Sequence, residues 1–385
     1  MYERSSCLQV FICLLRIKYT PHPHVGDKWC IYPTYDYTHC IHDSLEHITH
    51  SLCTLEFEIR RDSYYWLLDA LEIYRPFVWE YSRLNLSRNV LSKRRLQTLV
   101  EKKYVSGWDD PRLLTINGLR RRGYTRDAIN GFIDSIGVTR RGNENILSIH
   151  NLEICLRRDL DKNAPRTMAI INPIKVVFEN LTSEKEIETF LFPKNPEKGK
   201  RIVTLTPVIY IENSDFREVD NEDFFGLSIN KETGLKYAGT IFCKQMLKDE
   251  SGNITLKCDY RDEVKKTKGR IHWIGEKDAV KCETRLYDHL FKSENPAALE
   301  NYLDDINPDS LIVRRNSLVY RALVKDMKPY DNFQFERSGY YVVDPDTDFN
   351  ISRYVFNLSI GLEDKKEDDN KSVKTDKNPG KTKKK

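Results

Sequence analysis

Residues 28–57 read KWCIYPTYDYTHCIHDSLEHITHSLCTLEF, a stretch that combines potential metal ligands with a regular spacing of apolar side chains. Four histidines and two cysteines fall within its segment 38–53. Apolar residues recur in that segment at intervals of three and four positions, at Ile41, Leu45, Ile48 and Leu52. This interval predicts an amphipathic helix that begins near Ile41 and buries its apolar face.

The histidines of this helix do not have the arrangement that a zinc site requires. A zinc ion needs three or four ligands at about 2.0–2.3 Å. At about 100° per residue, His47 and His50 lie about 60° apart on the helix, but His42 lies about 140° from His47. Glu46 precedes His47, whereas the glutamate of the zinc-protease motif follows its first histidine. We therefore expect no protein-bound metal.

The composition of the whole chain is that of a globular protein. Of its 385 residues, 31% are charged, 39% apolar and 11% aromatic. No run approaches the roughly 20 apolar residues of a membrane span. The most apolar stretch, CLQVFICLL at residues 7–15, lacks the small-residue cleavage site of a secretion signal. The nine cysteines include no CxxC pair, which favours reduced thiols in a cytoplasmic protein without a membrane partner.

Positive charge is concentrated in the first 160 residues, although the formal net charge is only +4. Basic doublets and triplets recur there at Arg60-Arg61, Lys93-Arg94-Arg95, Arg120-Arg121-Arg122, Arg140-Arg141 and Arg157-Arg158. Each cluster alone reads most simply as a solvated helix face. Five clusters in one region also fit a positive surface that contacts phosphates.

The periodicity changes from helical to β-type near Met168. Helices are predicted over 125–137, with Thr125 as N-cap and Gly137 as the stop, and from Ser92 through 103. The β-type runs are IKVVF, RIVTLTPVIYI, GTIFCKQ, GRIHWI, LIVRR and GYYVV. One helix, NPAALENYL, is expected among them, with Asn295 as its cap. Many short strands with few helices predict barrels or a sandwich.

Read with its flanks, the opening stretch resembles the active-site half of eukaryotic-like class I glutaminyl-tRNA synthetases. The match is collinear over roughly residues 16–362. It continues through VWEYSRLNL, VLSKRR, GWDDPRLLTINGLRRRGYT, IGVT and DKNAPRTMAIINPIKVV, then more weakly through GRIHWI, ETRLYDHLF, NPDSL and FQFERSGYY.

The resemblance implies an α/β plus all-β architecture. Residues 16–95 would form the C-terminal half of a Rossmann-type catalytic domain, and residues 96–163 a helical connector along the tRNA stem. Two anticodon-binding β-barrels would follow over 164–362. Residues 1–15 would be an unrelated leader, and 363–385 a disordered, Lys-rich tail that could add nonspecific RNA affinity.

The resemblance also implies a glutamine pocket. Tyr35 would exchange a hydrogen bond with the side-chain amide, and His39 and Cys53 would complete the wall. Glutamate-specific relatives carry an arginine at the position of Cys53, as expected for binding a carboxylate. A thiol cannot neutralise that charge, so glutamine is favoured, with a glutamate–tRNA ligase as an alternative.

A second implied site binds ATP, which would enter as its Mg²⁺ complex. VLSKRR resembles the second signature loop of the family, with Leu91 in place of the commoner methionine. Lys93 would stabilise charge on the leaving pyrophosphate, and Ser92 and the helix N-terminus would donate to the phosphates. The remaining nucleotide contacts would be Thr54, Arg83 and Leu84.

The third implied site reads the anticodon of tRNA(Gln). Arg166, Gln334 and Arg337 match positions that contact anticodon bases in the family, and Lys236 matches a further one more loosely. Such side chains can read the edges of splayed, single-stranded bases.

One expected part of the family pattern is absent. No His-Ile-Gly-His-like first signature lies upstream of Tyr35, nor does an acidic residue for the α-amino group of glutamine. We therefore expect a truncated chain that binds tRNA but charges it poorly or not at all. A non-catalytic tRNA-binding module or pseudo-enzyme is the alternative, and membership of a synthetase assembly cannot be read from the sequence.

Overall fold

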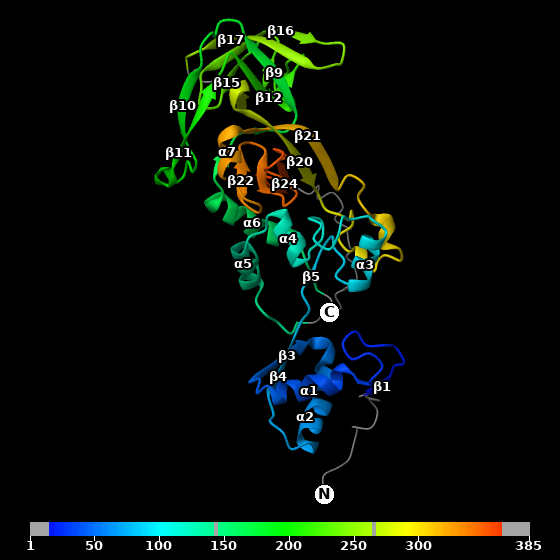
Figure 1. Ribbon diagram of the computed structural model, residues 1–385. Helices are drawn as coiled ribbons and strands as arrows, with labels where there is room; N and C mark the ends of the chain where they lie inside the picture. Colours follow the sequence, from blue (N-terminus) through cyan, green and yellow to red (C-terminus); the bar gives the residue numbers. More distant parts are fainter. Residues whose placement is uncertain (1–14, 142–144, 264–266, 364–385) are drawn as a thin grey trace, which may run out of the picture. The chain divides into compact units, whose positions relative to one another are not determined.

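The computed structural model describes residues 15–141, 145–263 and 267–363 (Figure 1). Most of the predicted leader and nearly all of the Lys-rich tail lie outside the described residues. The chain divides into two compact units. The first comprises Met1–Leu91, Asn130–Leu152 and Ser293–Glu300, and the second comprises Ser92–Ile129, Glu153–Lys292 and Asn301–Lys385.

The first unit contains three pairs of short strands and two helices of its own. Its elements are β1 (Leu15–Ile17), β2 (Ile31–Pro33), α1 (Tyr35–Leu45), β3 (His50–Thr54), the 3₁₀ helix η1 (Leu55–Arg60), α2 (Arg61–Ala70), β4 (Phe77–Tyr81), β5 (Asn85–Leu86) and β6 (Ile146–Leu147). Strands β1 and β2 are antiparallel, whereas β3 pairs with β4, and β5 with β6, in parallel.

The parallel pair β3–β4 organises this unit. Parallel strands need a long crossover connection, and η1 and α2 supply it here. The helices α1 and α2 pack through a small core with Cys40, Tyr64, Leu68 and Val78 at its centre. Burial alternates along β3, so Ser51 and Cys53 point inward while their neighbours are exposed.

The predicted helix from Ile41 through Leu52 is wrong in its bounds. The helix α1 begins six residues earlier, at Tyr35, and ends at Leu45. His47 has φ 54°, in the left-handed region, and the chain then enters β3. Leu45 and Leu52, which the helical pattern buries, are 66% and 56% exposed.

Five further helices follow among the described residues. They are α3 (Lys93–Glu101), α4 (Ile116–Arg122), α5 (Arg126–Ile136), α6 (Ile149–Asn163) and α7 (Arg321–Asp326). The predictions for α3 and α5 are confirmed: Ser92 is the N-cap residue of α3, and the Thr125 hydroxyl accepts from the Ala128 amide at 3.1 Å. None of the described helices is long and apolar enough to cross a bilayer.

The helix predicted over NPAALENYL is wrong. Two 3₁₀ turns, η5 (Pro296–Ala298) and η6 (Tyr302–Asp305), occupy this region instead. Leu299, between them, has extended backbone dihedrals, so the helical ladder is interrupted. Turn η5 belongs to the first unit and η6 to the second, which also contains three similar turns: η2 (Pro196–Lys198), η3 (Asn213–Asp215) and η4 (Glu276–Asp278).

The second unit contains two seven-stranded sheets. One has the order β18-β15-β16-β17-β9-β12-β19 and the other β7-β22-β23-β24-β20-β21-β8, while β10–β11 and β13–β14 form separate pairs. The bounds are β7 (Arg166–Thr167), β8 (Ala169–Ile170), β9 (Pro173–Phe178), β10 (Lys185–Phe190), β11 (Lys200–Leu205), β12 (Val208–Glu212), β13 (Phe216–Arg217), β14 (Leu227–Ser228), β15 (Glu232–Leu235), β16 (Thr240–Lys248), β17 (Ile254–Arg261), β18 (Arg270–Ile271), β19 (Trp273–Gly275), β20 (Ala279–Tyr287), β21 (Leu311–Tyr320), β22 (Asn332–Phe335), β23 (Gly339–Val343) and β24 (Val355–Ile360). All six β-type runs predicted from the sequence fall on these strands.

Both sheets curl back toward themselves. The edge strands of the first sheet, β18 and β19, are separated in the chain by His272 alone. The edge strands of the second, β7 and β8, are separated by Met168 alone. Because the two edges of each sheet are neighbours in sequence, each sheet is nearly closed and barrel-like.

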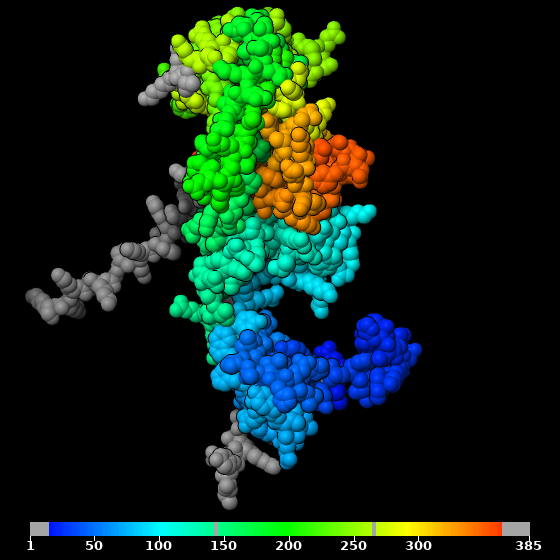
Figure 2. Space-filling view, turned by 60° about the vertical axis from the view of Figure 1, so that its left-hand side comes forward, coloured from blue at the N-terminus to red at the C-terminus, as the bar shows by residue number. Residues whose placement is uncertain are grey.

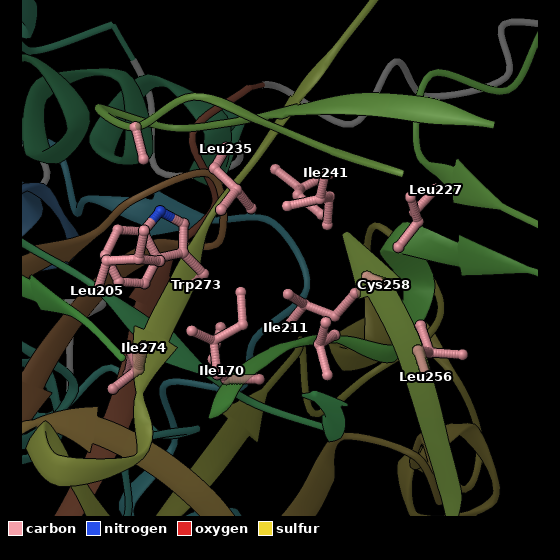
Figure 3. Packing of buried hydrophobic residues seen from close by; sticks show 14 of the residues in the cluster. Ile170, Leu205, Ile211, Leu227, Leu235, Ile241, Leu256, Cys258, Trp273 and Ile274 are labelled. Atoms are coloured by element: carbon pink, nitrogen blue, oxygen red, sulfur yellow. The ribbon is translucent and has the colours of Figure 1, made fainter. Parts of the chain in front are cut away.

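The two sheets share apolar contacts. Trp273 and Ile211 are fully buried in the core of the first sheet, and Ile170 of β8, from the second sheet, packs into the same core (Figure 3). Leu318 and Tyr320 of β21 extend this contact. In the space-filling view, green and orange residues of the second unit adjoin on the visible face (Figure 2).

Candidate functional site

The three residues predicted to bind glutamine converge on one pocket of the first unit. Tyr35 opens α1, His39 lies one turn later on the same helix face, and Cys53 reaches the pocket from β3. Eight further residues line it: Asp36, Phe57, Arg60, Arg61, Ser63, Tyr64, Val78 and Glu80. The pocket is therefore formed by α1, the β3–β4 pair and the crossover between its strands.

Aromatic rings form one wall of this pocket. The Tyr35 ring stacks on the His39 ring with centroids 4.9 Å apart. The centroid of the Phe57 ring lies 4.5 Å from that of Tyr35. Tyr64 meets His39 edge-on at 5.3 Å. Burial raises the pKa of Tyr35, so its phenol is a neutral group that can donate or accept one hydrogen bond.

A chain of hydrogen bonds orients the His39 ring. The Ser51 hydroxyl donates to Asp43 Oδ2 at 2.5 Å and lies 3.0 Å from His39 Nε2. Since the hydroxyl has one proton, it accepts from His39 Nε2–H, which leaves Nδ1 as an acceptor. Burial lowers the pKa of His39, so the ring is neutral near pH 7.

Cys53 lies opposite a buried carboxylate. In the parallel register of β3 and β4 its partner is Glu80, which is fully buried. Arg61 donates through Nε to Glu80 Oε1 at 2.9 Å and through Nη2 to Oε2, and these bonds lower the pKa of Glu80. Burial, and next the Glu80 charge, raise the pKa of Cys53 to about 11, so its thiol is protonated.

The opening cluster of histidines and cysteines is dispersed by the fold. His39 and Cys53 enter the pocket, Cys40 is buried in the core, and His42 and His47 are exposed. Within the described ranges, no three His, Cys, Asp or Glu side chains gather closely enough to hold a metal ion.

Several members of the five basic clusters bind groups of the protein itself. Arg60 and Arg61 pair with Asp36 and Glu80, and Arg140 pairs with Glu58. In the second unit, Arg121 pairs with Asp344, and Arg122 donates to the carbonyls of Tyr287 and Ser359. These guanidinium groups satisfy acceptors of the protein itself, whereas Lys93, Arg94 and Arg158 are exposed.

The predicted ATP residues belong to both units. In the first, Thr54 precedes η1 and its hydroxyl lies 3.4 Å from Glu56 Oε2, while Arg83 Nη1 lies 3.9 Å from Glu56 Oε1. Leu84 and Leu91 are partly exposed. In the second unit, Ser92 and Lys93 form the exposed start of α3.

Two of the predicted anticodon residues are neighbours in a sheet. Arg166 on β7 and Gln334 on β22 are register partners. The Arg166 guanidinium lies 3.7 Å from Asp161 Oδ1, and Gln334 Nε2 donates to the Tyr340 hydroxyl at 3.4 Å. Gln334 is buried and Arg166 half-buried.

The other two are Arg337, which follows β22, and Lys236, which follows β15. Arg337 donates to both Asp215 oxygens, at 2.5 and 2.8 Å, and to His272 Nδ1 at 3.0 Å. Lys236 pairs with the buried carboxylate of Glu336, the residue before Arg337.

Sequence reasoning missed the charged residues of the pocket. In the sequence, Asp36 and Glu80 stood out only as parts of the matched segments, and Arg60 and Arg61 only as a basic doublet. The alternation of buried residues in HSLCT and VWEY was the available signal, since two such strands place Cys53 and Glu80 on one face.

Three family models of one group of tRNA synthetases match successive parts of the chain. A model described as the catalytic domain of class I tRNA synthetases (E and Q) matches residues 11–162. Two models described as anti-codon binding domains of the same synthetases match residues 164–261 and 270–344.

Curated relatives extend over nearly all of the chain. A "Probable glutamine--tRNA ligase" of Dictyostelium discoideum is 49% identical over 95% of this chain and 47% of its own length. A "Glutamine--tRNA ligase" of Lupinus luteus is 48% identical over 91% of this chain and 45% of its own length. One of Yersinia enterocolitica is 46% identical over 91% of this chain and 64% of its own length. The chain thus spans about half to two thirds of the length of these relatives, and it belongs to the class I tRNA synthetases of the E and Q group.

Proposed function

We propose that the protein is a cytoplasmic glutamine–tRNA ligase, which activates glutamine with ATP and transfers it to tRNA(Gln). The observation that carries this proposal is the convergence of Tyr35, His39 and Cys53, three side chains that are neutral near pH 7, on one pocket. The names of the relatives, all glutamine–tRNA ligases, support the same substrate.

The pocket suits an amide better than a carboxylate. Tyr35 can accept from or donate to the amide, and His39 Nδ1 can accept a second N–H. The protonated Cys53 thiol offers no charge to balance a carboxylate. Fixed polar groups in a desolvated pocket discriminate between similar side chains, because a mismatched ligand leaves one of them unpaired.

In the proposed reaction, an oxygen of the glutamine carboxylate attacks the α-phosphorus of ATP, bound as its Mg²⁺ complex. The bond from that phosphorus to pyrophosphate breaks and glutaminyl-adenylate forms. A terminal ribose hydroxyl of the tRNA then attacks the glutaminyl carbonyl, and AMP leaves. Lys93 would stabilise the pyrophosphate, Ser92 and the α3 N-terminus would donate to phosphate oxygens, and Thr54, Arg83, Leu84 and Leu91 would hold the nucleotide.

The same proposal assigns the domains. Residues 16–95 would be part of a Rossmann-type catalytic domain, which the parallel pair β3–β4 with its crossover supports. Residues 96–163 would be the connector along the tRNA, and 164–362 two anticodon-binding barrels. Arg166, Gln334, Arg337 and Lys236 would contact the anticodon.

Charging of total tRNA with glutamine or glutamate, beside tRNA binding at fixed salt, tests the proposal. We expect glutamine to be the charged amino acid and tRNA(Gln) to be bound at least about tenfold more tightly than other tRNAs at the same ionic strength. Equal binding of all tRNAs, or preferential charging with glutamate, would contradict it. Binding without charging in a preparation of the full-length protein would favour a non-catalytic tRNA-binding module.

A further inference from the structure

The Glu80 carboxylate occupies the wall of the amino-acid pocket beside Cys53. The two residues are direct partners across β3 and β4, and adjacent partners of parallel strands point to the same face. Both line the pocket, and Glu80 is fully buried. A ligand atom that reaches Cys53 therefore also approaches a negative charge.

Arg61 holds this carboxylate in its charged form. Its Nε and Nη2 atoms bind the two Glu80 oxygens in a bidentate pair, the strongest arrangement of these two groups. A second guanidinium, that of Arg140, lies 3.7 Å from Glu80 Oε2 and pairs with Glu58.

Both arginines of the pocket lining are thus engaged. Arg61 pairs with Glu80, and Arg60 pairs with Asp36. Each guanidinium charge is therefore already balanced by a carboxylate of the protein, and a ligand carboxylate beside Cys53 would meet Glu80 as a like charge. Close like charges at a binding site weaken binding strongly, whereas a neutral amide meets no such penalty.

We propose that Glu80, held by Arg61, is a specificity-determining residue of the pocket: its charge beside Cys53 excludes an amino acid with a carboxylate side chain and admits the amide. This inference rests on the proposed function, because it assumes that the side chain of the amino acid reaches Cys53. It assigns the rejection of glutamate to a repulsive group as well as to the lack of an arginine.

The test measures the dissociation constants of glutamine and of glutamate for the full chain, for example by NMR titration. The decisive variant is Glu80→Gln, which keeps the shape of the side chain, removes its charge and releases Arg61. We expect the preference for glutamine to fall at least about tenfold. Glu80→Asp, which keeps the charge, should retain the preference within about threefold.

Glu58→Gln is the matched control. Glu58 belongs to the same network through Arg140 but is not among the residues that line the pocket, so its variant should keep the wild-type ratio of the two constants. If Glu80→Gln does not fold, as judged by circular dichroism, the double variant Glu80→Gln, Arg61→Gln removes both charges together. The preference of the double variant for glutamine over glutamate, measured as the ratio of the two dissociation constants, should be weaker than that of the wild type.

The dissociation constants of the wild type and of the variants separate the failure of the proposed function from the failure of the role of Glu80. A wild-type chain that binds glutamate as tightly as glutamine would overturn both the proposed function and the role of Glu80. A wild type that prefers glutamine, with Glu80→Gln or the double variant retaining that preference unchanged, would overturn the role of Glu80 alone.

Discussion

Lys93 is the first residue of α3, and its side chain is exposed. If its ammonium stabilises the leaving pyrophosphate, as proposed, Lys93→Ala should lower the rate of glutamine-dependent ATP–pyrophosphate exchange about 10²–10³-fold, as the loss of one oxyanion donor does elsewhere. Affinity for tRNA should change little, because most phosphate contacts remain.

Arg94 is the matched control for this prediction. It is the next residue of α3, it is also exposed, and it carries the same charge. Arg94→Ala should leave the exchange rate within about twofold of wild type if position, and not net charge alone, determines the effect. An exchange rate in Lys93→Ala equal to that of wild type would refute the role of Lys93.

Glu336 is a buried carboxylate of the second unit with three partners. It is 2% exposed and binds Arg201, Lys236 and the Tyr237 hydroxyl, the last at 2.9 and 3.1 Å. Glu336→Gln would leave the buried Arg201 without its counter-charge. We expect the free energy of unfolding in urea to fall by about 3–5 kcal/mol.

An exposed ion pair of the same unit gives the comparison. Glu188 pairs with Lys200, and the two side chains are 61% and 52% exposed. Glu188→Gln should change the unfolding free energy by no more than about 1 kcal/mol, because solvent screens the pair. Similar losses in the two variants would mean that burial of the pair is not what matters.

At the scale of elements, the end of α4 depends on Gly123. This residue has φ 96°, and a Cβ at its position would meet the Ser359 hydroxyl, lie 2.8 Å from Asn332 Oδ1 and 3.0 Å from Val342 Cβ. Gly123→Ala therefore combines backbone strain with a clash. We expect a loss of about 2–5 kcal/mol in unfolding free energy.

Gly137, which ends α5, is the control that separates backbone strain from the steric clash. It has φ 67°, but a Cβ at its position would meet no other atom of the described residues within 4 Å. Gly137→Ala should cost only about 1–2 kcal/mol, which is the strain of the left-handed backbone alone. Equal losses at the two glycines, measured by urea unfolding, would show that the contacts around Gly123 relax freely.

Helices with strong end signals were predictable from the sequence. Thr125 and Gly137 bound α5, and Ser92 begins α3, so local chemistry determines both helices. The helix predicted through Leu52 failed for the opposite reason. Residues 50–54 form a strand because they pair with β4, which begins 27 residues further along, and no local spacing encodes that partner.

The residues of the candidate site also include some that were predictable from the sequence and some that were not. Tyr35, His39 and Cys53 were predicted through the resemblance and do converge on one pocket. Glu80 and Arg61 were not predicted, because their role depends on the register of β3 with β4 and on the start of α2. Tertiary pairing, and not the residue types themselves, makes them part of the site.

At the scale of the whole molecule, single buried residues join the edges of the two barrel-like sheets. Met168 separates β7 from β8, and His272 separates β18 from β19. Arg337, in the hairpin after β22, donates to His272 and Asp215 and so links the second sheet to the closure of the first. The protonation state of His272 should therefore affect the stability of both sheets.

His272 accepts from Arg337 through Nδ1, so its neutral form is the one that fits this contact. Burial lowers the pKa of His272 to about 4, with the nearby Asp215 charge opposing the shift and Arg337 assisting it. In the unfolded chain the pKa is about 6.5. The unfolded state therefore binds more protons as the pH falls from 6.5 to 4, and the stability due to neutral His272 is lost over that range.

From these values we expect His272 to account for about 2 kcal/mol of the stability lost between pH 7 and pH 5. Amide hydrogen exchange in β18 and β19, measured at both pH values, reports the opening of this sheet. His272→Asn keeps an acceptor near Nδ1 but does not titrate, so its loss between the two pH values should be smaller than that of wild type by this amount. Equal losses in wild type and variant would mean that carboxylates elsewhere in the unit, and not His272, determine the acid sensitivity of the paired sheets.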